Sequence, residues 1–312
     1  MDDGTGRVTH AAAMPAPTSP LERGARGRAM LLMLGSVALF ALMDAGLKTL
    51  APHYPPFQVA FLRGASSLPL LLVWALWTVG VRAMLAVRWP LHVLRGALGV
   101  MMMASFVYAL RSLPLSTAYS IFFVGPLLIT ALSVPILRER VGPRRWTAIA
   151  IGMAGVLVLL RPSGEGMLSL AGFAVLLAAL GYAVSAITVR VLARTDPTQA
   201  ITFWLLALMA VGAGLLAWPQ WQPLQGAHLW VVAAIGVAGA IGQWAITEAF
   251  RLGEASAIAP LEYTALVWGV LLDATLWGVL PDSVTWLGAA IIVASGLYLL
   301  RRERVHVEAE HP

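Results

Sequence analysis

Ionisable side chains inside long apolar stretches offer the most chemistry in this sequence. Asp44, Arg63 and Asp273 all lie within such stretches. A charged group in hydrocarbon costs several kcal/mol unless it pairs or faces water, so groups of this kind bind charged solutes or transfer protons. If the chain turns near His53, Asp44 and Arg63 reach a similar depth of roughly 14 Å at about 1.5 Å per residue. We predict that they form an ion pair, with Lys48 as a competing partner, and that Asp273 joins this outer cluster. The alternative is that Arg63 only joins two helices and Asp273 only reaches the headgroups.

A second pair of carboxylates flanks a short turn towards the other face. Glu248 and Glu262 lie on either side of Gly253 at similar depths. Two carboxylates held close together in a low dielectric do not both ionise easily, so one of them titrates nearer neutrality, as a proton-transferring site requires. The alternative is that Glu248 pairs with Arg251 at i,i+3 and that Glu262 faces interfacial water.

Several aromatic and amide side chains could shape a binding cavity. The candidates are Tyr119, Tyr182, Gln243, Tyr263 and Trp268. Each ring has an apolar body, and each Tyr, Trp and Gln also carries a polar group that can orient a solute. Taken singly, most aromatic residues of a membrane protein pack against neighbours or anchor the interface. Packing is therefore the competing interpretation for each of these rings.

Motifs for catalysis or metal binding are missing from the sequence. It has no cysteine, and its six histidines fall in tails, loops or span ends without a His-Glu-x-x-His arrangement. The only lysine is Lys48, so a Gly-x-x-x-x-Gly-Lys phosphate loop is absent. We predict no catalytic residues, no metal site and no cofactor. The chain is not expected to be an enzyme.

The composition indicates an all-α integral membrane protein. Hydrophobic residues make up 59% of the chain and charged residues 12%, with a mean hydropathy of +0.81. A helix of about 20 apolar residues crosses roughly 30 Å of hydrocarbon with its backbone internally bonded. We predict ten transmembrane helices, at 29–50, 57–79, 92–110, 116–137, 146–160, 168–190, 200–217, 229–250, 256–279 and 284–300.

The cations give an orientation, because loops rich in Lys and Arg stay cytoplasmic. Most of the 21 Lys and Arg residues fall on one side of the ten-span arrangement, and Arg82, Arg88 and Arg95 are counted in one loop of that side. Both termini are then cytoplasmic, in tails at 1–28, which we expect to be disordered, and at 302–312. The formal charge of +6 reflects topology, so no nucleic-acid partner is expected.

An internal repeat relates the two halves of the chain. Residues 109–161 align without a gap on 249–301 at a constant spacing of 140, and the earlier spans match weakly at 142, where Phe61 meets Phe203. Each half, 29–161 and 168–301, then holds five spans. Because five is odd, the second half enters the membrane inverted. Inverted repeats place a substrate site near the midplane between the halves.

These residues together resemble the EamA family of the drug/metabolite transporter superfamily. The resemblance rests on Leu39 to Lys48, Phe61 to Arg63, Pro126, Leu137 to Arg140, Gly152 to Leu160, Glu254 to Ser256, Ala259 with Pro260, Pro281 and Gly288. The chain departs from the family where Val279 stands opposite Glu139, since the family keeps a Glu at both positions. That departure puts a latch on the outer side in doubt.

The resemblance implies a secondary active transporter of the inner membrane that works by alternating access. It favours export of amino acids or related compounds. A nucleoside, a riboflavin-like solute or a cationic drug-like solute is the alternative, and a membrane-embedded enzyme or non-transporting scaffold is the alternative of a different class. Proton coupling is a hypothesis motivated by Asp44, Glu248, Glu262 and Asp273. The expected partners are a small-molecule substrate and the lipid bilayer, and a homodimer is left open.

Overall fold

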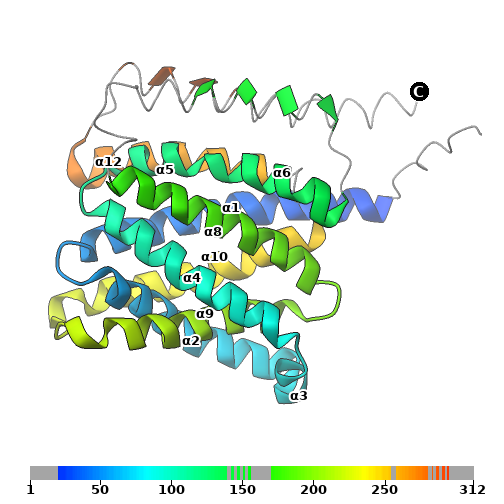
Figure 1. The fold of residues 1–312 in the computed structure, drawn as a ribbon, viewed down its shortest axis with the longest axis horizontal. Coiled ribbons are helices and arrows are strands. Elements are labelled where there is room, and N and C mark those ends of the chain that lie inside the picture. The colour runs from blue at the N-terminus through cyan, green and yellow to red at the C-terminus, as the bar shows by residue number, and fades with distance from the viewer. Residues whose placement is uncertain are drawn as a thin grey trace, which may run out of the picture.

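The computed structural model describes residues 20–138, 170–253 and 258–279, with isolated positions between 142 and 155 and between 283 and 294. All the regular secondary structure in this described part is helical (Figure 1). The α-helices are α1 (Pro20–Leu50), α2 (Pro56–Thr78), α3 (Gly80–Leu85), α4 (Trp89–Leu110), α5 (Leu115–Phe122), α6 (Val124–Leu137), α8 (Leu170–Leu192), α9 (Thr198–Ala217), α10 (Leu229–Leu252) and α12 (Ala265–Trp277). The 3-10 segments are η1 (Trp218–Gln220), η2 (Gly226–His228) and η3 (Ala259–Thr264).

Seven helical segments in this part are long and apolar enough to cross a membrane. They correspond to predicted spans one to four and six to eight. The predicted ninth span is instead a 3-10 turn, η3, followed by α12. The predicted spans 146–160 and 284–300 lie largely outside the described residues, so ten helices stay a prediction. Helix α1 begins at Pro20, inside the predicted tail 1–28, because hydropathy locates the apolar part of a helix and not its first hydrogen bond.

Two spans are not continuous α-helices. The fourth is divided at Phe123 into α5 and α6, just before Pro126, which has no N–H to donate. The ninth changes from η3 to α12 after Thr264, and Pro260 stands at the start of η3. Phe123 and Tyr263 occupy the same position of the repeat at a spacing of 140. Both spans are therefore irregular at equivalent places of the repeat.

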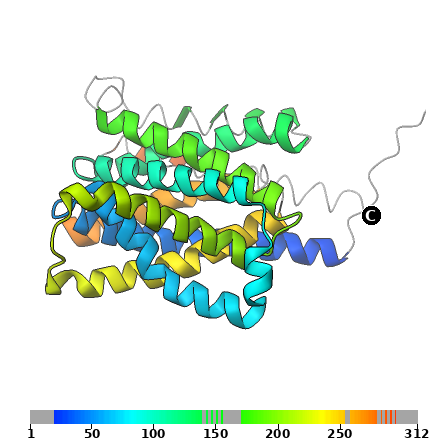
Figure 2. The ribbon, with the colours of Figure 1, turned by 60° about the horizontal axis from the view of Figure 1, so that its bottom comes forward.

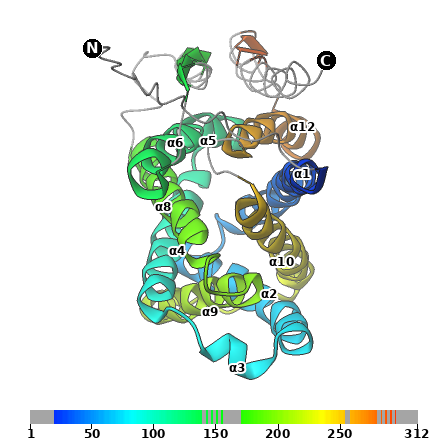
Figure 3. The ribbon, with the colours of Figure 1, turned by 90° about the vertical axis from the view of Figure 1, so that its right-hand side faces the viewer.

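Viewed end-on, the long helices form a ring (Figure 3). The most extensive contacts join α1 to α10, α2 to α9, and α4 to α8, so each pair takes one helix from each half. The short helix α3 lies at one end of the bundle, beside the end of α2 (Figure 2). Gly80 starts it with a φ of 75°, a backbone conformation that glycine adopts without strain.

Individual contacts repeat between the two halves. A Cβ added at Gly242 in α10 would lie 3.4 Å from Cβ of Leu39 in α1, and one added at Gly181 in α8 would lie 3.6 Å from Cβ of Met102 in α4. Leu39 is related to Gly181 by the spacing of 142, and the spacing of 140, continued a few residues ahead of 109, relates Met102 to Gly242. The α1–α10 and α4–α8 contacts are thus equivalent. The Phe123 ring packs edge-on to the ring of its repeat mate Tyr263, with centroids 5.1 Å apart.

The crossing of α10 over α2 depends on Gly236. A Cβ there would lie 2.7 Å from the carbonyl oxygen of Ser66, and small residues allow this kind of close approach. We expect Gly236→Ala to destabilise the protein by about 1–3 kcal/mol, because a rigid backbone must shift. Thermal unfolding in detergent measures the loss. Gly35→Ala is the matched control, since Gly35 is exposed and has nothing within 4 Å of such a Cβ. An equal effect of the two substitutions would contradict this account.

Candidate functional site

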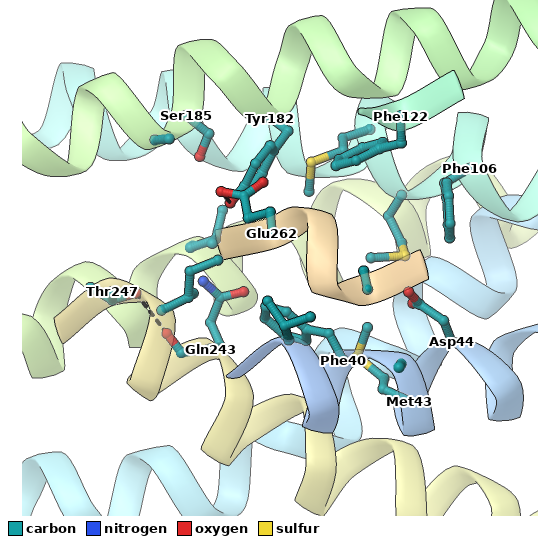
Figure 4. A pocket seen from close by; sticks show the side chains of 18 of the residues that line it. Phe40, Met43, Asp44, Phe106, Phe122, Tyr182, Ser185, Gln243, Thr247 and Glu262 are labelled. Atoms are coloured by element: carbon teal, nitrogen blue, oxygen red, sulfur yellow. Dashed lines mark hydrogen bonds between the residues drawn. The ribbon is translucent and has the colours of Figure 1, made fainter. Parts of the chain in front are cut away.

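A cavity lies inside the ring of helices. It encloses about 1050 Å³ of space free of protein atoms, including the part open to solvent. Its apolar lining includes Phe40, Phe106, Phe122, Phe123, Phe250, Met43, Met102 and Met103. Its polar lining comprises Asp44, Arg63, Arg95, Tyr119, Tyr182, Ser185, Gln243, Thr247 and Glu262. Figure 4 shows the side chains of Asp44, Tyr182, Gln243 and Glu262, together with the rings of Phe40, Phe106 and Phe122, around one space.

Two carboxyl groups of the cavity each accept a hydrogen bond from a tyrosine. The Tyr119 hydroxyl donates to Asp44 Oδ2 at 2.8 Å, and the Tyr182 hydroxyl donates to Glu262 Oε1 at 2.8 Å. Asp44 and Tyr119 come from the first and fourth spans, and Tyr182 and Glu262 from the sixth and ninth. The same pair of helices in each half is therefore joined by one carboxyl–tyrosine bond. Sequence reasoning named all four residues but neither pairing.

Arg63 contacts Gln243 rather than Asp44. Its Nη2 donates to Gln243 Oε1 at 3.0 Å, while its Nε is buried without a partner. Asp44 and Arg63 both line the cavity but do not form an ion pair within 4.0 Å, so that prediction is wrong. The reason is helix order: α2 packs against α10 far more than against α1, so the first two spans are consecutive in sequence without being close neighbours.

Asp273 lies outside the cavity lining, contrary to the predicted cluster. It is 1% exposed and binds Lys48 Nζ at 2.8 Å. It also accepts hydrogen bonds from the Leu115 and Ser116 backbone N–H groups at 3.3 and 2.9 Å and from the Ser116 hydroxyl at 2.8 Å. A carboxylate on the free N–H groups of a helix start is a favourable cap for α5. Lys48 therefore pairs with Asp273, not with Asp44.

The predicted pair of carboxylates, Glu248 with Glu262, is also wrong. Glu248 accepts a hydrogen bond from the Thr198 hydroxyl at 2.7 Å and pairs with Arg251 at 3.1 Å, as the i,i+3 alternative expected. Glu248 is not part of the cavity lining, whereas Glu262 is. The two side chains face different neighbours because η3 turns Glu262 towards α8 while α10 directs Glu248 towards α9.

Two of the aromatic candidates also lie outside the cavity lining. The Tyr263 ring packs on Phe123 and its hydroxyl is buried without a partner. Trp268 is 36% exposed, on the outer surface of α12, where a bilayer would contact it. Tyr119, Tyr182 and Gln243 do line the cavity. A helix of the ninth span presents only one face inward, so adjacent candidates on it could not all be right.

Sequence reasoning missed Arg95 as a cavity residue. It was counted among loop cations, yet it is 1% exposed and lines the cavity from α4. Its Nη1 donates to the Ile201 carbonyl at 2.9 Å and its Nε to the Ser185 hydroxyl at 3.3 Å. The signal was available, because the predicted span 92–110 already contained Arg95. Like Arg63, any cation inside a predicted span must pair or face water.

A second polar contact ties the loop after α8 to the start of α4. His92 Nε2 lies 2.9 Å from Asp196 Oδ2, to which the Arg88 backbone N–H also donates at 3.1 Å. Burial raises the pKa of Asp196, but hydrogen bonds from Thr195, His92 and the Arg88 backbone outweigh it and hold this pKa below its ordinary value. Asp196 therefore stays ionised at neutral pH and fixes the α8–α9 turn.

A bundle of apolar spans around a partly polar cavity is the architecture of a membrane-embedded carrier. The sequence model of the EamA-like transporter family matches residues 27–161 and again 169–301. The chain belongs to this family, and it is a transporter rather than an enzyme.

Several characterised relatives align over most of the chain. It is 31% identical to a riboflavin transporter of Vibrio cholerae, covering 87% of this chain and 89% of the relative. It is 27% identical to an S-adenosylmethionine uptake transporter of Rickettsia prowazekii, covering 88% and 93%. It is 25% identical to a pseudopaline exporter of Pseudomonas aeruginosa, covering 88% and 96%. A crystal structure that is 23% identical superposes with a TM-score of 0.70 over 89% of this chain and 99% of that one, which shows a shared fold.

Proposed function

We propose that this protein is a secondary carrier for a planar aromatic metabolite, with riboflavin as the first substrate to test. The observation that supports this most directly is the cavity, in which aromatic and methionine side chains surround the Arg63–Gln243 pair. Ring stacking suits a flat solute. An amide and a guanidinium suit the carbonyl-rich edge of such a solute, which accepts hydrogen bonds.

The relative named as a riboflavin transporter also supports this choice over the amino acids that the family resemblance suggested. The cavity wall is rich in aromatic and apolar side chains, which suits a flat ring better than a small polar amino acid. Relatives are named for uptake and for export, so we propose no fixed direction. A symmetric carrier runs as its gradients drive it. The placement of arginines supports an inner-membrane location with both termini cytoplasmic.

We further propose that protons drive transport through the carboxyl groups of the cavity. Glu262 is 7% exposed, and within the described residues no cation lies within 4.0 Å of it. A buried carboxylate without a cation is costly, so a proton or a cationic solute group neutralises Glu262. Asp44 has the Arg63 guanidinium in the same cavity. The other two carboxylates first considered for proton coupling, Glu248 and Asp273, each pair with a cation outside the cavity lining. Asp44 and Glu262 therefore remain as the proposed coupling groups.

Purified protein in liposomes tests the proposed substrate through riboflavin fluorescence. We expect saturable riboflavin transport that aromatic solutes inhibit and alanine does not. Arg63→Ala should reduce transport by about 30-fold or more, because it removes a buried charge bonded to Gln243. Trp268→Ala is the control, since Trp268 lies outside the cavity lining. Full transport by Arg63→Ala, or transport of alanine in preference to riboflavin, would refute the proposal.

A further inference from the structure

Arg95 is a buried cation whose charge nothing nearby in the described structure balances. It lies on α4 and is 1% exposed. Its two hydrogen-bond partners, the Ser185 hydroxyl and the Ile201 carbonyl, are both neutral. Within the described residues, no carboxylate lies within 4.0 Å of its guanidinium. The other buried cavity arginine, Arg63, shares its cavity with Asp44 and thus has an acidic neighbour.

An uncompensated cation in a membrane-embedded site is costly, so it persists where a ligand or a function requires it. A purely structural role for Arg95 would require only hydrogen-bond donors for its two neutral acceptors. A neutral side chain such as that of glutamine could also donate to them. Five N–H donors are available on a guanidinium, and two of its nitrogens make the recorded bonds. The group borders the cavity, so its remaining donors and its charge are available to a solute there.

We propose that Arg95 is the anion subsite of this cavity and selects aromatic solutes that carry a carboxylate or phosphate. The aromatic wall formed by Phe40, Phe106 and Phe122 then holds the rings, while Arg95 pairs with the anionic group. Guanidinium matches both carboxylate and phosphate in bidentate geometry. This inference rests on the proposed function as a carrier of aromatic solutes and adds a charge requirement to it.

The arrangement of α4, α8 and α9 explains how the subsite is held. Ser185 and Tyr182 are one turn apart on α8, so Arg95 and Glu262 are linked to the same helix by separate hydrogen bonds. An anion at Arg95 raises the local negative charge, which favours a proton on Glu262. The binding of an anionic solute and of a proton would thus support each other.

Matched pairs of probes test the charge requirement in nanodiscs that contain the full chain. The first pair is indole-3-acetate and neutral indole-3-acetamide, and the second is riboflavin 5′-phosphate and riboflavin. Affinity is measured by isothermal titration calorimetry. We expect the wild-type protein to bind the anionic member of each pair at least tenfold more tightly. Equal binding of the two members by the wild-type protein would overturn the proposal, whatever the variants do.

Variants then locate the effect. Arg95→Gln should weaken the anionic probes by about 30-fold or more and the neutral probes little, and Arg95→Lys should restore part of the preference. Arg111→Gln is the control, because Arg111 likewise donates to two neutral acceptors, the backbone carbonyls of Ala51 and Tyr54, but lies outside the cavity lining. Equal weakening of both members in Arg95→Gln would indicate a structural role and overturn the proposal.

The two pairs separate this inference from the proposed substrate. If only the indole pair binds, and Arg95 determines its charge preference, flavins are the wrong substrate and the anion subsite stands. If flavins bind without regard to charge, the proposed function stands and the anion subsite is wrong.

Discussion

Replacing Glu262 with glutamine should abolish substrate accumulation driven by a pH gradient while leaving exchange of substrate across the membrane intact. Glutamine keeps the size of the side chain and still accepts the Tyr182 hydrogen bond, which is 2.8 Å long in the structure. It cannot carry a proton in one state and release it in the other. A gradient of one pH unit supplies about 1.4 kcal/mol per proton, or tenfold accumulation. The variant should lose that factor and reach only equal concentrations.

Liposomes loaded at one pH and diluted into another measure this accumulation, and counterflow with no gradient measures exchange. Glu248→Gln is the matched control. Glu248 is also a buried glutamate, 7% exposed, but it binds Thr198 and Arg251 outside the cavity lining. The control should keep its accumulation. If Glu262→Gln still accumulates substrate tenfold across one pH unit, Glu262 does not couple protons to transport.

Hydropathy was sufficient to predict where most membrane helices lie, because crossing hydrocarbon requires about 20 apolar residues whatever the tertiary fold. It could not predict how a span is built internally. The ninth span is a 3-10 turn followed by α12, since Pro260 and its neighbours determine local hydrogen bonding without changing mean hydropathy. Hydropathy also missed the start of α1 at Pro20, where the helix continues through polar residues.

Depth in the membrane was the basis for predicting the site, and depth alone does not determine partners. Asp44 and Arg63 do line the cavity, but they bind Tyr119 and Gln243. Those partners depend on the order of helices around the ring, in which α10 lies against both α1 and α2. No pattern within one span carries that information.

The repeat gave a better guide to the site than depth did. We can compare positions where the halves differ: Arg63 against Leu205 and Phe122 against Glu262. All four of these residues line the cavity. A cavity near a two-fold axis receives equivalent positions from both halves, so it becomes chemically selective only where those positions differ. Two further mismatches do not follow this pattern: neither Tyr108 nor its mate Glu248 lines the cavity, nor does Val279, whose mate Glu139 lies outside the described residues.

Asp273→Asn should open one end of the transport pathway. We call the end that carries the α1–α2 turn the His53 end, which the sequence predicts to face outward. There Asp273 joins α12 to Lys48 of α1 and to Ser116 of α5. Because Val279 stands where the family keeps a Glu, the sequence put a latch at this end in doubt. The Lys48–Asp273 ion pair provides a latch there that uses different residues. The repeat mate of Asp273 at a spacing of 140 is Ser133, which has no charge, so this ion pair cannot form at the opposite end.

Removing one partner of a buried ion pair costs roughly 3–5 kcal/mol, and this cost falls on the conformation in which the His53 end is closed. The variant should therefore populate the conformation open at that end, with at least tenfold faster access.

The chain has no cysteine, so Ala265→Cys in the cavity lining provides a single thiol for a membrane-impermeant maleimide. We expect faster labelling from the His53 side in Asp273→Asn and also in Lys48→Gln. Asp196→Asn, which removes the carboxylate charge beside His92 in the α8–α9 turn, is the control and should not accelerate labelling from that side. Unchanged labelling in both latch variants would mean that the Lys48–Asp273 pair stabilises the fold without controlling access, because its loss would then affect both conformations equally.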